Sequence, residues 1–79
     1  MPTFEYEQPE EALHIHANPA ELRHLATLFT QLAESIERTG HNHVHLHTPQ
    51  WGGNELSEEK QSVSSSLINH VKIHGWPNS

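Results

Sequence analysis

The sequence predicts a small α+β domain, a two-layer sandwich in which one long helix packs on a mixed sheet of three or four strands. Two observations predict this class. One stretch, about residues 19–38, carries apolar side chains at the three- and four-residue steps of a helix. Short segments on both sides of it alternate apolar and polar residues, which is typical of half-buried strands. The expected order is β-β-α-β-β, with the helix covering the apolar side of the sheet.

Residues 3–7 and 12–17 are expected to form the first two strands, joined as a hairpin through a turn at residues 8–10. The first segment sets two aromatic residues against two glutamates. In the second segment, Leu13 and Ile15 point to one side, which we expect to be buried, and two histidines point to the other.

The helix has start and stop signals. Asn18 is an N-cap residue, Pro19 suits the first helical position, and Glu21 can reach back to complete a capping box. Gly40 ends the helix. The predicted apolar stripe consists of Leu22, Leu25, Ala26, Phe29, Leu32, Ala33 and Ile36, with Leu28 on its margin.

Two further strands are expected at residues 42–48 and 68–75, each with two aliphatic residues on its inner side. Between them, residues 49–66 form a long loop, with room for one helical turn at 57–61, and residues 77–79 form a flexible tail. The whole chain, 1–79, is expected to be a single domain.

Composition excludes several function classes. The 79 residues contain no cysteine, so disulfides and thiolate metal sites are impossible. Ten glutamates against four Lys and Arg give a net charge of −6, which does not suit nucleic-acid binding. No segment approaches the roughly 18 apolar residues of a membrane span, and no charged-then-apolar leader precedes residue 15. We therefore expect a cytoplasmic protein that binds neither nucleic acid nor membranes.

Histidine dominates the outward strand positions. Seven of the nine histidines are expected on one side of the sheet, although each strand is phased by its own apolar residues. This predicted histidine face consists of His14, His16, His43, His45, His47, His70 and His74. If all nine histidines were protonated, the formal charge would change from −6 to +3.

A metal site is one interpretation of this face, because neutral imidazole binds Zn, Ni and Cu, and histidines at i and i+2 on a strand can share an ion. The candidate ligands are His14, His16, His43, His45 and His47. An open sheet face lacks the surrounding groups that orient ligands. We therefore expect no resident cofactor, only adventitious Zn or Ni binding.

Protein contact is the other main interpretation, with a second copy of the chain or a different protein covering the face; a pH-sensing role is a third. The tryptophan–glycine loop either adds to the contact or plugs the core with Trp51. Trp76 is expected to cap the core. The predicted partner-binding loop residues are Trp51, Gly52, Gly53, Asn54 and Glu55.

Catalytic patterns are weak. Residues 57–60 match a Ser-x-x-Lys string, but the other elements of such an acyltransferase and the room for them are missing. No phosphate-binding glycine loop is present. We expect no enzymatic activity.

Two stretches carry a resemblance to a known family. They read Leu-His-Ile-His-Ala-Asn-Pro-Ala-Glu-Leu from residue 13 and His-Val-His-Leu-His-Thr-Pro-Gln-Trp-Gly-Gly-Asn-Glu-Leu-Ser from residue 43. With the leucine-rich helix between them, the chain resembles the immunity protein 32 family, most specifically over residues 45–57. The resemblance implies a partner of the polymorphic toxin class, a bacterial toxin encoded by a neighbouring gene, which the protein neutralises by binding.

Three hypotheses follow. The first is a non-enzymatic protein-binding module, an immunity protein that uses the predicted histidine face and the 51–55 loop. The second is a small histidine-rich protein that binds Zn, Ni or Cu through the same face. The third is a homodimeric structural domain.

Overall fold

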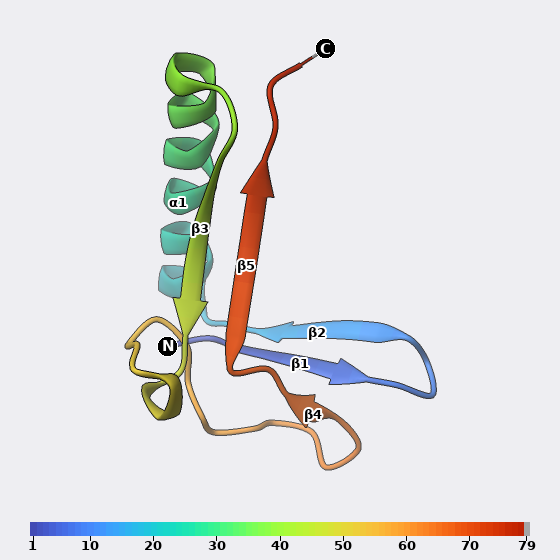
Figure 1. Cartoon of the computed structure of the whole chain (residues 1–79). Coiled ribbons are helices and arrows are strands. Elements are labelled where there is room, and N and C mark those ends of the chain that lie inside the picture. The colour runs from blue at the N-terminus through green and yellow to red at the C-terminus, as the bar shows by residue number, and fades with distance from the viewer. Residues whose placement is uncertain (79) are drawn as a thin grey trace.

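The computed structural model describes residues 1–78 and shows two antiparallel sheets and one long helix. In Figure 1, a three-stranded sheet of order β2-β1-β4 consists of β1 (Thr3–Glu7), β2 (Ala12–His16) and β4 (Ser66–Leu67). The two-stranded sheet pairs β3 (Asn42–His47) with β5 (His70–Gly75). Helix α1 (Pro19–Thr39) connects the two sheets, and a short 3-10 helix, η1 (Pro49–Trp51), follows β3.

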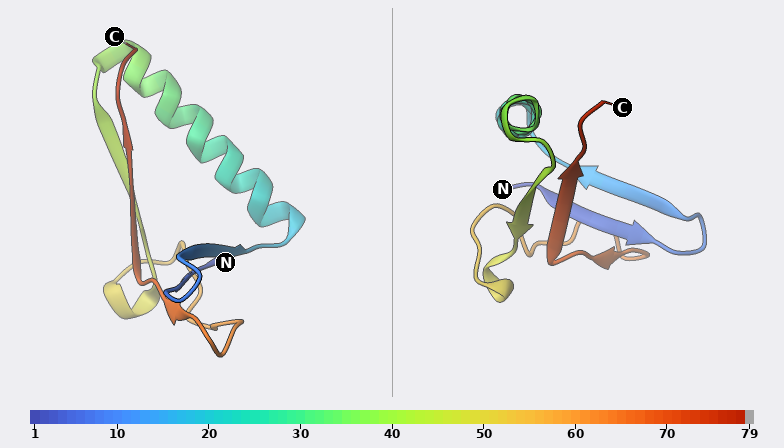
Figure 2. Two further views of the ribbon diagram at one scale, coloured as in Figure 1. Left: turned by 90° about the vertical axis from the view of Figure 1, so that its right-hand side faces the viewer. Right: turned by 45° about the horizontal axis from the view of Figure 1, so that its top comes forward.

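The three parts enclose an open triangle. In the left view of Figure 2, α1 meets the β3–β5 pair near its C-terminal end and diverges from it toward its N-terminal end, where β2 leads into the helix. The three-stranded sheet closes the base. The right view of Figure 2 shows β1 and β2 projecting away from the helix and the β3–β5 pair.

The α+β class is confirmed, but the predicted single mixed sheet is wrong, because the strands form two separate antiparallel sheets. Strand β1 pairs with β2 over five residues as a local hairpin, whereas β4 extends that sheet over only two. The chain then bends at Ile68 and Asn69, where Ile68 N–H donates to Phe4 O (2.8 Å) and Thr48 N–H donates to Asn69 O (3.0 Å). This bend separates β5 from the first sheet and pairs it with β3.

Both helix ends follow the predicted signals. The Asn18 side chain accepts a hydrogen bond from Glu21 N–H (2.8 Å), and Asn18 N–H donates to Glu21 Oε1 (2.8 Å), which completes the capping box. Gly40, at φ 84°, donates its N–H to Ile36 O and ends the helix one residue later than predicted.

The core lies where the two sheets and the helix meet. Phe4, Leu25, Leu46 and Leu56 are buried together, and Leu28, Ile68, Val71 and Ile73 pack against them. Leu56 belongs to the predicted loop, yet none of its surface is exposed. The loop therefore contributes a central core residue.

Part of the predicted core is open to solvent. Leu13 and Ile15 of β2 are 56% and 46% exposed, and Leu22 and Phe29 of α1 are 54% and 47% exposed. One edge of the apolar stripe of α1, with Leu22 and Phe29, therefore faces away from the core, whereas Leu25 and Leu32 on the other edge are buried. Leu28, on the predicted margin, instead packs on the core.

The predicted loop, residues 49–66, contains η1 and the first residue of β4, and the helical turn expected at 57–61 is absent. Its second half packs on the polar side of the three-stranded sheet. Ser57 N–H donates to Pro2 O (2.7 Å), and Gln61 and Ser62 donate their N–H groups to the Glu5 carboxylate. The predicted tail, 77–79, ends at Ser79, which lies outside the described residues.

No helix within residues 1–78 has both the length and the apolar character needed to cross a membrane.

Candidate functional site: a histidine row on the two-stranded sheet

Six histidines lie on the side of the β3–β5 pair that faces away from the core. Val44 and Leu46 of β3 and Val71 and Ile73 of β5 alternate with them and occupy the opposite side. In the strand register, His43 is paired with His74, His47 with His70, and His45 with Lys72. We call this set the histidine row: His41, His43, His45, His47, His70 and His74.

The rings of the row contact one another in sequence. His43 and His45 have ring centroids 4.9 Å apart, and His47 stacks on His70 at 4.3 Å. An indole lies at each end, with Trp76 stacked on His41 at 4.1 Å and Trp51 lying 6.2 Å from His70. The result is a nearly continuous strip of flat rings along the sheet.

One end of the row holds three nitrogen ligands, of which His47 and His70 are partly buried and His45 is exposed; we call this group the half-buried triad: His45, His47 and His70. Their ligand atoms all lie within 4.8 Å of one another. His45 Nδ1 and His70 Nε2 are 2.8 Å apart, a hydrogen bond that requires one ring nitrogen to carry a proton and the other a lone pair.

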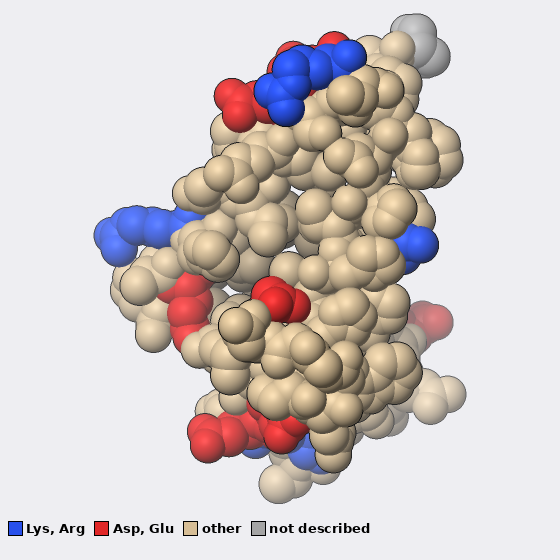
Figure 3. Space-filling view, turned by 60° about the vertical axis from the view of Figure 1, so that its left-hand side comes forward, with Lys and Arg blue, Asp and Glu red and all other residues tan. Residues whose placement is uncertain are grey.

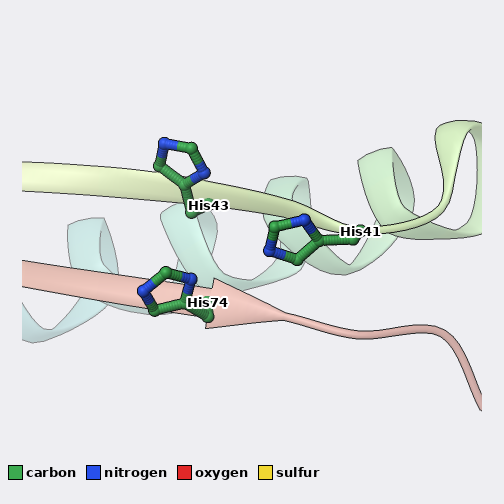
Figure 4. Close-up of side chains that lie close together, drawn as sticks. All are labelled: His41, His43 and His74. Atoms are coloured by element: carbon green, nitrogen blue, oxygen red, sulfur yellow. The ribbon is translucent and has the colours of Figure 1, made fainter.

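The other end holds a second group, which we call the exposed triad: His41, His43 and His74. Their ligand atoms also lie within 4.8 Å of one another. Figure 4 shows the three rings gathered on one side of β3 and β5, with α1 behind the strands. Each triad therefore takes two rings from the β3 side and one from β5.

The environment favours the neutral form of two histidines in the row, His45 and His74. Burial among neighbouring rings lowers the pKa of His45, and the charges of His43 and Lys72 lower it further. Burial also lowers the pKa of His74, and again Lys72 adds to the effect. A neutral ring keeps a lone pair that can bind a metal or accept a hydrogen bond, and it is less costly to desolvate than a charged one.

The 51–55 loop is fixed against the half-buried end of the row. The Glu55 carboxylate accepts His47 N–H (2.9 Å) and Asn54 N–H (3.2 Å), and these hydrogen bonds lower the pKa of Glu55. Gly52 is left-handed at φ 87°. A Cβ on Gly53 would lie 2.5 Å from His47 Cβ, so only glycine allows this approach.

Neither tryptophan packs on the core, although the sequence suggested this for both. Trp51 is 60% exposed and does not plug the core, and Trp76 is 69% exposed and stacks on the histidine row instead of capping the core. Neither Trp76 nor His41 belongs to the face that the sequence predicts. His41 precedes the strand, but it lies two residues before His43, and this spacing could have placed both histidines on the same side.

His14 and His16 do not join the row, which corrects the predicted seven-histidine face. They belong to β2, in the other sheet, where His14 Nε2 lies 3.1 Å from Glu7 Oε1 and His16 Nε2 lies 3.9 Å from Glu5 Oε2. The alternation within each strand was read correctly, but the two sheets do not share a face.

Figure 3 shows a mostly tan face with a few Lys, Arg and Glu side chains, and blue and red groups lie against one another at its top. Between α1 and β3, a cavity of about 430 Å³ is lined mainly by apolar residues that include Leu25, Leu28 and Leu46.

The Ser-x-x-Lys residues make ordinary loop contacts: Lys60 Nζ donates to Ser65 O, and Ser57 Oγ accepts Glu59 N–H.

Comparison with known families agrees with the resemblance seen in the sequence. The model of the family described as Immunity protein 32 matches residues 12–72. The chain belongs to the immunity protein 32 family. The match spans β2, α1, β3 and the start of β5, so it includes the half-buried triad of this family member, whereas His74 and Trp76 lie beyond it. No curated protein and no solved structure matches the chain significantly.

Proposed function

We propose that this protein is a non-catalytic immunity protein that neutralises a cognate bacterial toxin by binding it directly. Membership of the immunity protein 32 family over residues 12–72 carries the proposal. The accessible side chains support it, because they offer a stacked aromatic strip. An inhibitor that works by occlusion needs only such a complementary surface.

The proposed contact surface is the histidine row together with the 51–55 loop. Interfaces are anchored most often by Trp, Tyr and Arg, and here Trp51 and Trp76 lie exposed at the two ends of the row. Imidazole rings lie between them, and each ring nitrogen can donate or accept a hydrogen bond according to its tautomer. The net charge of −6 would steer the protein toward a basic cleft, such as that of a toxin acting on nucleic acid.

The proposal predicts that a neighbouring gene encodes a large secreted protein with a variable C-terminal domain, and the test uses that domain as the toxin. Co-expression with this chain should restore growth, and calorimetry should show a 1:1 complex. We expect Trp51→Ala and Trp76→Ala each to weaken binding by about 2 kcal/mol, roughly thirtyfold, because each removes an exposed aromatic anchor.

The matched control is Phe29→Ala, which removes an aromatic ring that is 47% exposed on α1 and belongs to neither the row nor the cavity beside the 51–55 loop. It should bind as the parent chain does. Absence of any complex with the neighbouring toxin domain would overturn the proposed function. Full affinity in both tryptophan variants would overturn only the proposed surface.

A second copy of the chain is another candidate partner, and the exposed side chains of β2 favour it. Strand β2 is an edge of its sheet, so its outer backbone groups are unpaired, and it carries exposed Leu13 and Ile15. Antiparallel pairing of two β2 strands about His14 would set Leu13 of each copy against Ile15 of the other. That arrangement satisfies two-fold symmetry and covers the apolar residues.

A further inference from the structure

The histidine row has the ligand chemistry of a metal centre as well as that of a contact surface. Imidazole nitrogen suits Zn²⁺, Ni²⁺ and Cu²⁺, and three histidines with one open position is an established zinc arrangement. Each triad supplies three such nitrogens within 4.8 Å of one another. We propose that the half-buried triad and the exposed triad each bind one divalent transition-metal ion. The chain would then hold two ions, one toward each end of the β3–β5 pair.

Distances support this assignment. With Zn–N bonds of about 2.0–2.1 Å, tetrahedral geometry sets two ligand nitrogens about 3.3 Å apart. His45 Nδ1 and His70 Nε2 lie 2.8 Å apart, and no ligand pair within a triad exceeds 4.8 Å. The nitrogens of each triad thus lie within about 1.5 Å of the spacing that one ion requires.

Hydrogen bonds hold the backbone around the half-buried triad. Glu55 holds the His47 backbone, and its carboxylate places a negative charge near the ring. On the other side, Thr48 Oγ1 donates to Asn69 Oδ1 (2.6 Å), which ties the end of β3 to the residue before His70. These contacts fix the backbone at and next to two of the three ligands, His47 and His70, and so limit how far these ligands can move.

Both ions would act across strands. The half-buried triad joins His45 and His47 of β3 to His70 of β5, and the exposed triad joins His41 and His43 to His74. A two-stranded sheet is held together by a single ladder of hydrogen bonds. A metal ion at each end would therefore add a second kind of link between β3 and β5. Metal binding should therefore raise the temperature of unfolding.

Lys72 gives a directional test of the geometry. It lies on the same side of β5 as the histidines, opposite His45 and between the positions of His70 and His74. Its positive charge opposes a cation in either triad. Lys72→Gln should therefore tighten metal binding several-fold at low ionic strength, and added salt should reduce the difference.

The experiment is a titration of chelator-treated, untagged protein with Zn²⁺, repeated with Co²⁺ to read coordination from its visible absorption. We expect two equivalents at micromolar affinity or tighter, with the strong absorption of four-coordinate Co²⁺. His70→Asn and His74→Asn should each remove one equivalent, that is, weaken one site by about tenfold or more. Circular dichroism checks that each variant is folded.

The control is the double variant His14→Asn/His16→Asn, which removes the two histidines of β2 and should keep both equivalents. One equivalent or none in the parent chain would overturn the proposal. Weak uptake at many sites, or a loss in the control equal to that in the two single variants, would overturn it too. The titration involves no toxin, so its result is independent of the proposed immunity function.

Discussion

Glu5 shows how much a single residue can depend on distant parts of the chain. Its carboxylate is fully buried and accepts hydrogen bonds from Ser65 Oγ (2.6 Å), Thr3 Oγ1 (2.8 Å) and Gln61 N–H (2.9 Å), and from Ser62 N–H. Burial alone would raise the pKa of Glu5, but these hydrogen bonds outweigh it and lower the pKa to about 2.

Glu5 should therefore make the protein sensitive to acid. Because its pKa is lower in the folded state, its stabilising effect is present above pH 4.5 and is lost as the pH falls through about 2. Glu5→Gln should lower the free energy of unfolding at pH 7 by about 2–3 kcal/mol and reduce the loss of stability below pH 4.5. Urea unfolding at a series of pH values measures both effects.

Glu10→Gln is the control for this variant, since Glu10 is exposed in the hairpin turn. If both variants lost the same stability, the Glu5 network would not contribute as described. The sequence places Glu5 on a strand but gives no sign of its burial. Its partners lie up to 60 residues away in a loop without periodicity, so no local pattern could have predicted them.

At the scale of the elements, α1 is the part that its sequence specifies best. The capping box, the proline and the glycine are all local signals, so both ends could be predicted from a few residues. Asn18→Ala should lower the free energy of unfolding by about 1 kcal/mol, because Glu21 N–H loses its acceptor. Denaturant unfolding gives this value, with the exposed Asn78→Ala as the control. An unchanged midpoint would show that the cap adds nothing to stability.

The strands were predicted less completely. Alternation shows which side chains of one strand share a side, and it located four of the five strands. It does not show which strands pair, and β4 is too short at two residues to carry any pattern. The candidate site could therefore be predicted only in part. Five of its six histidines were expected on a common face, but the two histidines of β2 were also expected there, and they lie in the other sheet.

At the scale of the whole molecule, the open triangle leaves apolar side chains uncovered. If the chain dimerises through β2, Ile15→Lys should shift it to a monomer, and the monomer should keep its fold, because Ile15 is already 46% exposed in the single chain. Light scattering after size-exclusion chromatography measures the mass. The control is Val63→Lys, which adds the same charge at a residue that is 99% exposed.

A parent chain that is monomeric at its highest soluble concentration would rule out this dimer and leave the apolar residues for another partner. The openness of the triangle was not predictable, because the period of an apolar stripe sets its direction and not the angle at which the helix crosses a sheet.

The two indoles at the ends of the histidine row have a practical consequence. Trp51 and Trp76 are the chain's two tryptophans, and each lies beside an imidazole. Their fluorescence therefore reports on opposite ends of the same strip without any added dye. Replacing one indole by phenylalanine leaves an emission signal from the other end alone, so events at the two ends can be observed separately in solution.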